Sequence, residues 1–185
     1  KYNQNFCHNV KELYPDNLKN YKIFERKNLK ESNNIITSLK NKCIFISRVS
    51  ALPKEVKINS DNIIWSSGLK TWKQLVSRGI WVNGSSDGLG EDFENNISAL
   101  TDFSWVKLTH RDAPNSKIVK KIATYQLEKL NFKINIKEKK HFYWMSSSAF
   151  KYTLEKYPEL KEKYHYCGPG NTYNEIYSIL GNDKN

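Results

Sequence analysis

Short apolar segments of strand type alternate along this chain with segments of helical type. Three of the strands run directly into a turn rich in Ser and Gly, after which a helical pattern begins. These three junctions lie at residues 63–68, 142–148 and 166–172. Because strands and helices that alternate regularly are typical of α/β proteins with parallel sheets, the sequence predicts an α/β fold with helices flanking each sheet.

The same alternation predicts the bounds of the individual elements. Strands are expected over residues 21–26, 43–46, 63–65, 80–82, 103–108, 122–127, 142–145 and 164–167. Helices are expected from Asn28 or Ser32 to Leu39, and over residues 69–77, 91–99, 115–120, 148–156 and 172–180. The order strand, Ser-rich turn, helix, strand, Gly-rich turn, helix occurs once in each half, which predicts two similar lobes with a cleft between them.

Each Ser/Gly-rich junction is a candidate binding site for an anion. The first turn of a helix has backbone N–H groups without partners inside the helix, and the helix dipole makes this end positive. In open α/β sheets, ligands bind outside the carboxyl ends of the strands, where these turns fall. The same residues also suit the simpler role of helix N-caps, and the two roles are compatible.

The formal net charge of +11 indicates a polyanionic partner. A basic chain can bind nucleic acid, a membrane surface or an anionic small molecule. The lysines are scattered among Asn and Ile residues, so part of the charge reflects biased composition rather than a binding surface. A hydrophobic fraction of 38% and an aromatic fraction of 13% provide for a packed core, which argues against a disordered basic tail.

The cysteines and the hydropathy pattern indicate a cytoplasmic protein without membrane contact. Cys7, Cys43 and Cys167 are odd in number and far apart, so they fit neither a metal site nor a disulfide framework. Such cysteines favour a reducing compartment. No apolar run approaches the length of a membrane span, and no signal-peptide pattern is present.

No conventional catalytic or cofactor motif stands out. The segment Gly84–Gly90 lacks the Lys-Ser/Thr pair of a Walker loop and the regular spacing of a dinucleotide fingerprint. It is interpreted as a plain turn or an anion-binding turn. The run from His110 to Asp112 is more simply a solvated corner with a local ion pair than a catalytic cluster. No pattern of metal ligands is recognised, so we expect neither a metal nor a cofactor.

Taken in order, six short motifs resemble the uroporphyrinogen-III synthase family. They cover about residues 20–180, the second half matches better, and the ordered set is more specific than any single motif. The motifs are Phe24-Glu25-Arg26, Ile64-Trp65-Ser66-Ser67, Val82-Asn83-Gly84-Ser85-Ser86, Thr124-Tyr125-Gln126-Leu127, Tyr143-Trp144-Met145-Ser146-Ser147-Ser148 and Gly168-Pro169-Gly170-Asn171-Thr172.

The resemblance implies two α/β lobes, each a parallel sheet flanked by helices, joined by two extended linkers. Lobe one is expected to hold residues 19–50 and 119–185, and lobe two, inserted into it, residues 51–118. Residues 1–18 are interpreted as a lead-in or a fusion linker. Some members of the family are fused to hydroxymethylbilane synthase, and the chain begins without a Met, which fits such a fusion.

The resemblance also implies an activity, that of a lyase in tetrapyrrole (heme) biosynthesis. The substrate is hydroxymethylbilane, a linear tetrapyrrole with eight carboxylates, which is cyclised with loss of water and inversion of the last ring. Tyr125 is the candidate proton donor to the leaving hydroxyl. We expect a monomer that works beside, or fused to, hydroxymethylbilane synthase. The expected substrate-binding residues are Arg26, Ser66, Ser67, Ser85, Ser86, Ser146, Ser147, Ser148, Gly168, Asn171 and Thr172.

Two other functions stay open at the level of sequence. A non-enzymatic basic α/β module could bind nucleic acid or another polyanion, although no basic helix and no stripe of alternating aromatic and basic residues is evident. A flavodoxin-like cofactor binder is the third alternative, and the yellow colour of bound flavin would identify it. The resemblance makes nucleic acid an unexpected partner.

Overall fold

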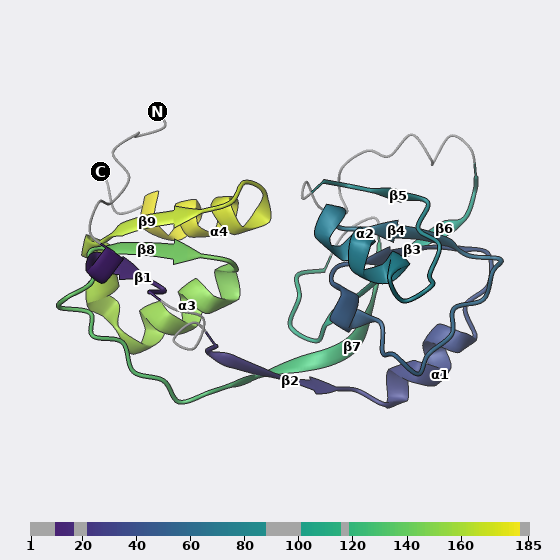
Figure 1. The fold of residues 1–185 in the computed structure, drawn as a ribbon, viewed down its shortest axis with the longest axis horizontal. Helices are drawn as coiled ribbons and strands as arrows, with labels where there is room; N and C mark the ends of the chain where they lie inside the picture. Colours follow the sequence, from purple (N-terminus) through teal and green to yellow (C-terminus); the bar gives the residue numbers. More distant parts are fainter. Residues whose placement is uncertain (1–9, 17–21, 88–100, 116–118, 182–185) are drawn as a thin grey trace. The chain divides into compact units, whose positions relative to one another are not determined.

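The computed structural model describes residues 10–16, 22–87, 101–115 and 119–181. The chain divides into two compact units (Figure 1). Unit 1 holds residues 1–25 and 129–185, and unit 2 holds residues 26–128. Unit 2 is thus inserted into unit 1, and the chain enters unit 2 within the strand β2 (Phe24–Asn28) and leaves it within β7 (Lys120–Lys129).

Unit 2 is built on a six-stranded sheet with the strand order β2-β7-β6-β3-β4-β5. The pairs β3–β4, β3–β6, β4–β5 and β6–β7 are all parallel. The other strands are β3 (Lys42–Ile46), β4 (Ile63–Ser66), β5 (Gly84–Ser85) and β6 (Ser104–His110). The helices are α1 (Glu31–Thr37), the 3₁₀ turn η2 (Val49–Ala51) and α2 (Leu69–Val76).

The core of unit 2 is centred on β3, because this strand is paired on both sides and covered on both faces. Its residues from Cys43 to Ile46 are at most 1% exposed. Such a continuous apolar run is typical of a central strand in a parallel sheet. Ile44 and Ile46 pack with Leu75 of α2 and Leu108 of β6 in one cluster. The carboxyl ends of β3, β4 and β6 therefore meet at one edge of the sheet.

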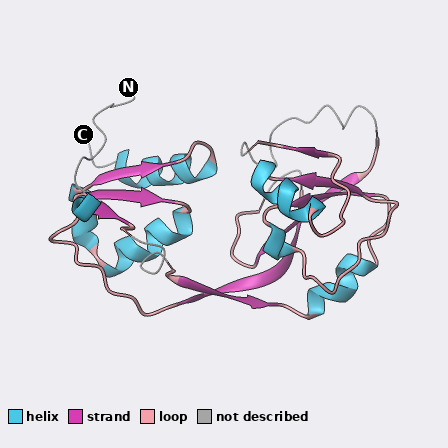
Figure 2. Ribbon diagram, viewed as in Figure 1, coloured by secondary structure: helices cyan, strands magenta, loops and turns pink. Residues whose placement is uncertain are grey.

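Unit 1 is built on a three-stranded parallel sheet in the order β1-β8-β9 (Figure 2). These strands are β1 (Leu13–Tyr14), β8 (His141–Trp144) and β9 (Tyr164–Cys167). The helices are α3 (Ser147–Lys156) and α4 (Asn171–Leu180), with the 3₁₀ turns η1 (Val10–Glu12) and η4 (Pro158–Glu162). Phe142 and Trp144 alternate with outward residues and pack with Phe150 of α3 and Ile176 of α4.

The two faces of this smaller sheet differ in their covering. Both α3 and α4 contribute to the cluster on the Phe142 side. The opposite face carries His141, Tyr143, Tyr164 and Tyr166, of which Tyr143 is 42% and Tyr164 64% exposed. Parallel sheets are normally covered on both faces. Within the described residues, this face of unit 1 is open.

Most of the elements expected from the sequence are confirmed, with bounds shifted by one to three residues. Two are wrong. Residues 80–82 form a loop in which Trp81 is 79% exposed, and the strand beside β4 is Gly84–Ser85 instead. Of the helix expected over 115–120, residue 119 lies in a bend and Lys120 already begins β7, while residues 116–118 lie outside the described residues. The helix expected over 91–99 lies outside the described residues.

The division between the units also differs from the expected lobes. Residues 26–50 and 119–128, expected in lobe one, belong to unit 2. The physical reason is that β3 pairs with β4 and β6 in the middle of the larger sheet. Residues 10–16 are not a simple lead-in, because β1 pairs with β8 and the Tyr14 side chain is only 4% exposed in the core of unit 1.

None of the helices in the described part of the chain has the length and apolar character needed to cross a bilayer.

Candidate functional site

In unit 2, hydrogen bonds link the strands at the carboxyl edge of the sheet. The backbone N–H and the hydroxyl of Ser47 both donate to the Leu108 carbonyl, at 3.2 and 2.8 Å. The Ser67 N–H donates to the Ile46 carbonyl at 3.1 Å, and its hydroxyl donates to the Ser47 carbonyl at 2.7 Å. The turn after β4 is therefore held in register with the turns after β3 and β6.

The other serines expected to bind substrate in unit 2 have mainly internal partners. Ser66 is fully buried, and its hydroxyl lies 3.4 Å from the carbonyls of Gly68 and Gly84. The Ser86 hydroxyl is also buried and accepts from the Trp65 indole N–H at 3.1 Å. The Ser85 hydroxyl accepts from the Asp87 N–H at 3.2 Å. These groups shape the edge, and Ser67 and Ser85 are the two that are partly exposed.

Tyr125, the candidate proton donor, lies in β7 with its ring buried beside two basic residues. It is 2% exposed and belongs to the apolar cluster of unit 2. The Arg26 guanidinium carbon is 6.0 Å from the centre of the Tyr125 ring, within the range of a cation–π contact. The His110 ring centre is 5.9 Å away on the other strand. The structure thus brings two sequence candidates, Arg26 and Tyr125, to one place.

His110 ends β6 next to an irregularity in the pairing with β7. Thr109 pairs with Ala123 but His110 pairs with Tyr125, so Thr124 is an additional residue in β7. Such a bulge re-aims the side chains beside it. Nδ1 of His110 is the one buried side-chain nitrogen or oxygen among the described residues without a hydrogen-bond partner. A nitrogen left in this state costs about 1–3 kcal/mol.

The environment of His110 is cationic. Burial is the largest cause that lowers the pKa of this imidazole below its usual value, and the Asp112 carboxylate partly opposes it. The charges of Lys107, Arg48 and Lys121 lower the pKa further. The imidazole is therefore neutral near neutral pH, with cations around it and one nitrogen unpaired.

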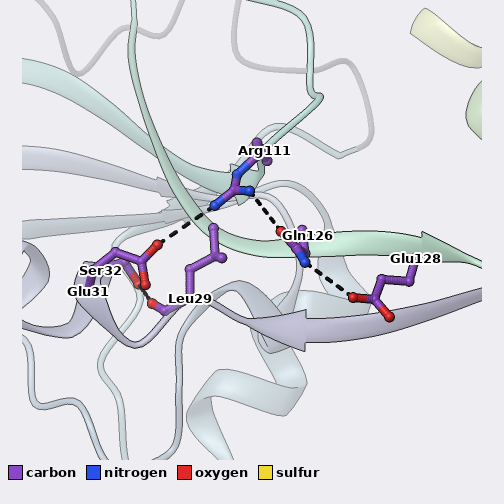
Figure 3. Close-up of polar contacts among 6 residues, drawn as sticks. All are labelled: Leu29, Glu31, Ser32, Arg111, Gln126 and Glu128. Atoms are coloured by element: carbon purple, nitrogen blue, oxygen red, sulfur yellow. Dashed lines mark hydrogen bonds and ion pairs between the residues drawn. The ribbon is translucent and has the colours of Figure 1, made fainter.

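Arg111, the next residue, is engaged by acceptors (Figure 3). Its guanidinium donates to the Gln126 amide oxygen at 2.8 Å and lies 3.7 Å from the Glu31 carboxylate. Gln126 in turn donates to Glu128 at 3.3 Å. These contacts tie the end of β6 to β7 and to α1, so the ion pair of Arg111 is formed with a distant residue of the sequence rather than locally.

In unit 1, the two helix heads expected to bind anions follow neighbouring parallel strands. Ser146 is the N-cap of α3, and its hydroxyl accepts from the Ala149 N–H at 3.3 Å. Ser147 and Ser148 form the first turn of α3 and are partly exposed. Because β8 and β9 run parallel, these serines lie at the same sheet edge as the turn after β9.

The turn after β9 presents the uncapped start of α4. Gly170 has φ 89° and ψ −151°, a backbone conformation that essentially only glycine adopts, and no side chain caps the helix. Asn171 and Thr172 follow in the first turn of α4. At Gly168 an added Cβ would meet nothing within 4 Å, so the backbone there faces open space. The residues of this turn can donate backbone hydrogen bonds to an anion.

The expected site residues are divided between the two units, and within unit 2 Arg26 and Tyr125 lie on β2 and β7, at the other side of the sheet from the serines on and beside β4 and β5. In unit 2 they are Arg26, Ser66, Ser67, Ser85, Ser86 and Tyr125; in unit 1 they are Ser146, Ser147, Ser148, Gly168, Asn171 and Thr172. Sequence reasoning set His110 aside and did not consider Arg48. The available signal was their position, since both follow or end strands at the carboxyl edge of a parallel sheet.

No group of three or more His, Cys, Asp or Glu side chains in the described ranges is arranged to hold a metal ion. Comparison of the chain with protein-family models and with curated proteins gives no match.

Proposed function

We propose that this protein is a uroporphyrinogen-III synthase, which cyclises hydroxymethylbilane with inversion of the last pyrrole ring. The observation that carries the proposal is the insertion of one parallel α/β unit into another, with Ser- and Gly-rich turns at the carboxyl edge of each sheet. The resemblance to the family also implies an inserted α/β lobe, with bounds (residues 51–118) that differ from those of unit 2. Both units carry net positive charge, which suits a substrate with eight carboxylates.

Positioning carries most of the proposed chemistry. Hydroxymethylbilane loses its terminal hydroxyl readily and closes without an enzyme to the isomer in which no ring is inverted. The protein must hold the chain curled so that the last ring reacts through a spiro intermediate. Serine hydroxyls and backbone N–H groups at the helix heads would hold the carboxylates.

Tyr125 is the proposed donor to the leaving hydroxyl. As the carbon–oxygen bond breaks, the hydroxyl takes up a proton and departs as water, and the cationic carbon left behind is attacked by a ring carbon. The ring of Tyr125 is fixed by burial, while Arg26 lies over it. A buried, fixed donor needs little reorganisation when the charge develops.

Product analysis tests the proposal directly. Freshly generated hydroxymethylbilane is incubated with the protein, the product is oxidised, and the type I and type III porphyrin isomers are separated. We expect mostly type III, whereas heat-denatured protein should give mostly type I. Mostly type I porphyrin with well-folded protein would show that the proposal is wrong.

The open sheet face of unit 1 favours a second candidate, a module that binds single-stranded nucleic acid. Tyr143 and Tyr164 are exposed on that face, and lysines precede both strands. Bases stack on such aromatic platforms, at about 1–3 kcal/mol per base. A labelled oligonucleotide should then lose affinity with Tyr143→Ala and Tyr164→Ala but not with Tyr177→Ala, a matched exposed tyrosine on α4. Absence of binding at low salt excludes this candidate.

A further inference from the structure

The apolar outer surface of α2 in unit 2 is not explained by packing within the protein. Leu69 and Val76 of this helix are 58% and 51% exposed, and Trp81 in the loop that follows is 79% exposed. α2 lies over one face of the larger sheet (Figure 1), and its inner side packs there through Leu75, which is fully buried. The outer side of such a helix is normally polar, and clustered exposed apolar side chains mark interaction sites. We call Leu69, Val76 and Trp81 the α2 ridge.

Helical geometry brings Leu69 and Val76 onto one line. They are two turns apart, so they differ by only about 20° around the helix axis and by about 10 Å along it. At the end of α2, the Ile80 N–H donates to the Leu75 carbonyl at 3.1 Å, which holds the loop against the last turn of the helix. Trp81 follows Ile80 directly, so it extends the ridge past the end of α2.

The charge next to the α2 ridge has one sign. Lys70 and Lys73 are exposed on the same helix, and Lys73 is offset from Leu69 by only about 40° around the axis. No Asp or Glu occurs in the segment 62–86. Arg78 is excluded from this charge, because its guanidinium donates to backbone carbonyls in and after η2. The ridge is therefore apolar with a basic flank.

We propose that the α2 ridge binds the surface of an anionic lipid bilayer, with the ridge side chains inserted at the headgroup level and the two lysines beside the lipid phosphates. A bilayer surface offers both chemistries, because anionic headgroups lie directly above the acyl chains. Basic amphipathic helices are typical of membrane-surface binding, and tryptophan is enriched at membrane interfaces. The expectation of no membrane contact was based on the lack of a span and of a signal peptide, and binding at a surface needs neither.

Two other occupants fit the ridge less well. A second copy of the chain, placed ridge to ridge, would bring Lys70 and Lys73 of both copies together, and like charges repel. A helix of a partner protein normally docks in a groove, whereas side chains that are more than half exposed project from the surface. A bilayer has no fixed shape to match, so it accepts a projecting ridge.

Flotation with lipid vesicles tests the proposal. The protein is mixed with vesicles of equal parts phosphatidylcholine and phosphatidylserine, or of phosphatidylcholine alone, at several salt concentrations. We expect binding to the anionic vesicles that weakens as salt rises, because salt screens the attraction between lysines and headgroups. Brominated acyl chains should quench part of the tryptophan fluorescence, and Trp81→Phe should remove the quenched part. No binding at low salt, or equal quenching in both proteins, would overturn the proposal.

Matched lysine variants separate the ridge from the general basic charge. Lys70→Gln/Lys73→Gln should weaken binding about 10- to 30-fold, since each lysine at an anionic surface contributes about fivefold. Lys133→Gln/Lys137→Gln removes the same charge from exposed positions of unit 1 and should change binding by less than about twofold. An equal loss in both pairs would show that binding follows net charge alone, which would overturn the proposal.

Trp81→Ala tests the apolar part of the contact. It removes a side chain that is 79% exposed, so the far-UV circular dichroism should not change, while binding to the vesicles should weaken at least about tenfold. Tyr177→Ala, which removes a 64% exposed ring of α4, is the control and should bind as wild type does. Wild-type affinity of Trp81→Ala would overturn the proposal. So would a dimer, detected by analytical ultracentrifugation, that Trp81→Ala dissociates, because a second copy would then cover the ridge.

Discussion

The most informative stability prediction concerns His165, which connects β9 to the core of unit 1. Its Nδ1 accepts from the Trp144 indole N–H at 2.9 Å, and its Nε2–H donates to the Leu160 carbonyl at 2.8 Å. Only the neutral imidazole with its proton on Nε2 can form both of these hydrogen bonds. The ring also packs against Phe150, with the ring centres 5.4 Å apart.

The change His165→Phe keeps the ring and removes both hydrogen bonds. The Trp144 side chain is 2% exposed and Leu160 is fully buried, so the indole N–H and the carbonyl oxygen lose partners that water cannot easily replace. Each unpaired group costs about 1–3 kcal/mol. We expect the free energy of unfolding of unit 1 to fall by about 2–4 kcal/mol, because the retained ring offsets part of the loss.

The same residue predicts a dependence on pH. Burial is the main cause that lowers the pKa of His165, while the hydrogen bond to Leu160 partly opposes it. The unfolded chain therefore takes up a proton at about pH 6.5, where the folded protein does not. Stability is full above that pH and falls as pH decreases toward the folded pKa, by at most about 1.4 kcal/mol per pH unit. The His165→Phe protein should not show this loss of stability at low pH.

The assay is urea unfolding at several pH values, followed by the Trp144 indole resonance. Trp144 is the tryptophan of unit 1, whereas Trp65, Trp72, Trp81 and Trp105 lie in unit 2. His141→Gln is the matched control, since His141 lies on the open face of the same sheet. A His165→Phe protein with wild-type stability and an unchanged pH slope would refute the reasoning.

Three further outcomes follow from local geometry. Gly170→Ala forces a non-glycine residue into φ 89° and should destabilise unit 1 by about 1–3 kcal/mol by urea unfolding, whereas Gly168→Ala should change stability by less than about 0.5 kcal/mol. Gly84→Ala places a Cβ 2.3 Å from the Trp65 ring and should cost about 1–3 kcal/mol, unless that indole moves without loss of its hydrogen bond. Tyr125→Phe should lower turnover of hydroxymethylbilane about 10- to 100-fold and barely change its affinity; unaltered turnover would reduce Tyr125 to a packing role.

Local patterns were sufficient to predict most of the elements. Cys43–Ile46 is a compact apolar run, and it is the central strand β3. Ser146 precedes a helical pattern, and it caps α3. The strand predicted over residues 80–82 is wrong, because an apolar run alone does not determine which residues pair with β4. Ile64 of β4 instead forms a hydrogen bond with Asn83, whose side-chain oxygen accepts from the Ile64 N–H at 2.9 Å.

Long-range features could not be predicted in the same way. The assignment of β3 to unit 2 depends on which strands pair, and that choice is made by contacts across 20 or more residues. Arg26 and Tyr125 were named as site residues only through the family resemblance, and their contact depends on how β2 and β7 are placed in the sheet. His110 and Arg48 were missed because their significance arises from an unpaired nitrogen and from charges on neighbouring strands, neither of which the sequence displays.

The insertion of unit 2 has a consequence for the order of folding. β1 can pair with β8 only after Leu13 meets His141, a contact between residues more than a hundred positions apart. Closing so long a loop in an unfolded chain is slow and entropically costly. Once unit 2 has formed, however, β2 and β7 are neighbours and Lys27 bonds Glu128 at 2.7 Å, so the two ends of the insertion are held together.

Folded unit 2 thus holds the two ends of the insertion close together, so the loop that must close when unit 1 folds is effectively shorter. During synthesis, residues 26–128 emerge before β8 and β9, which gives unit 2 time to fold first. A destabilising substitution in unit 2 should therefore slow the folding of both units, while one in β8 or β9 should leave the folding of unit 2 unaffected. The direction of this dependence is set by the chain path alone.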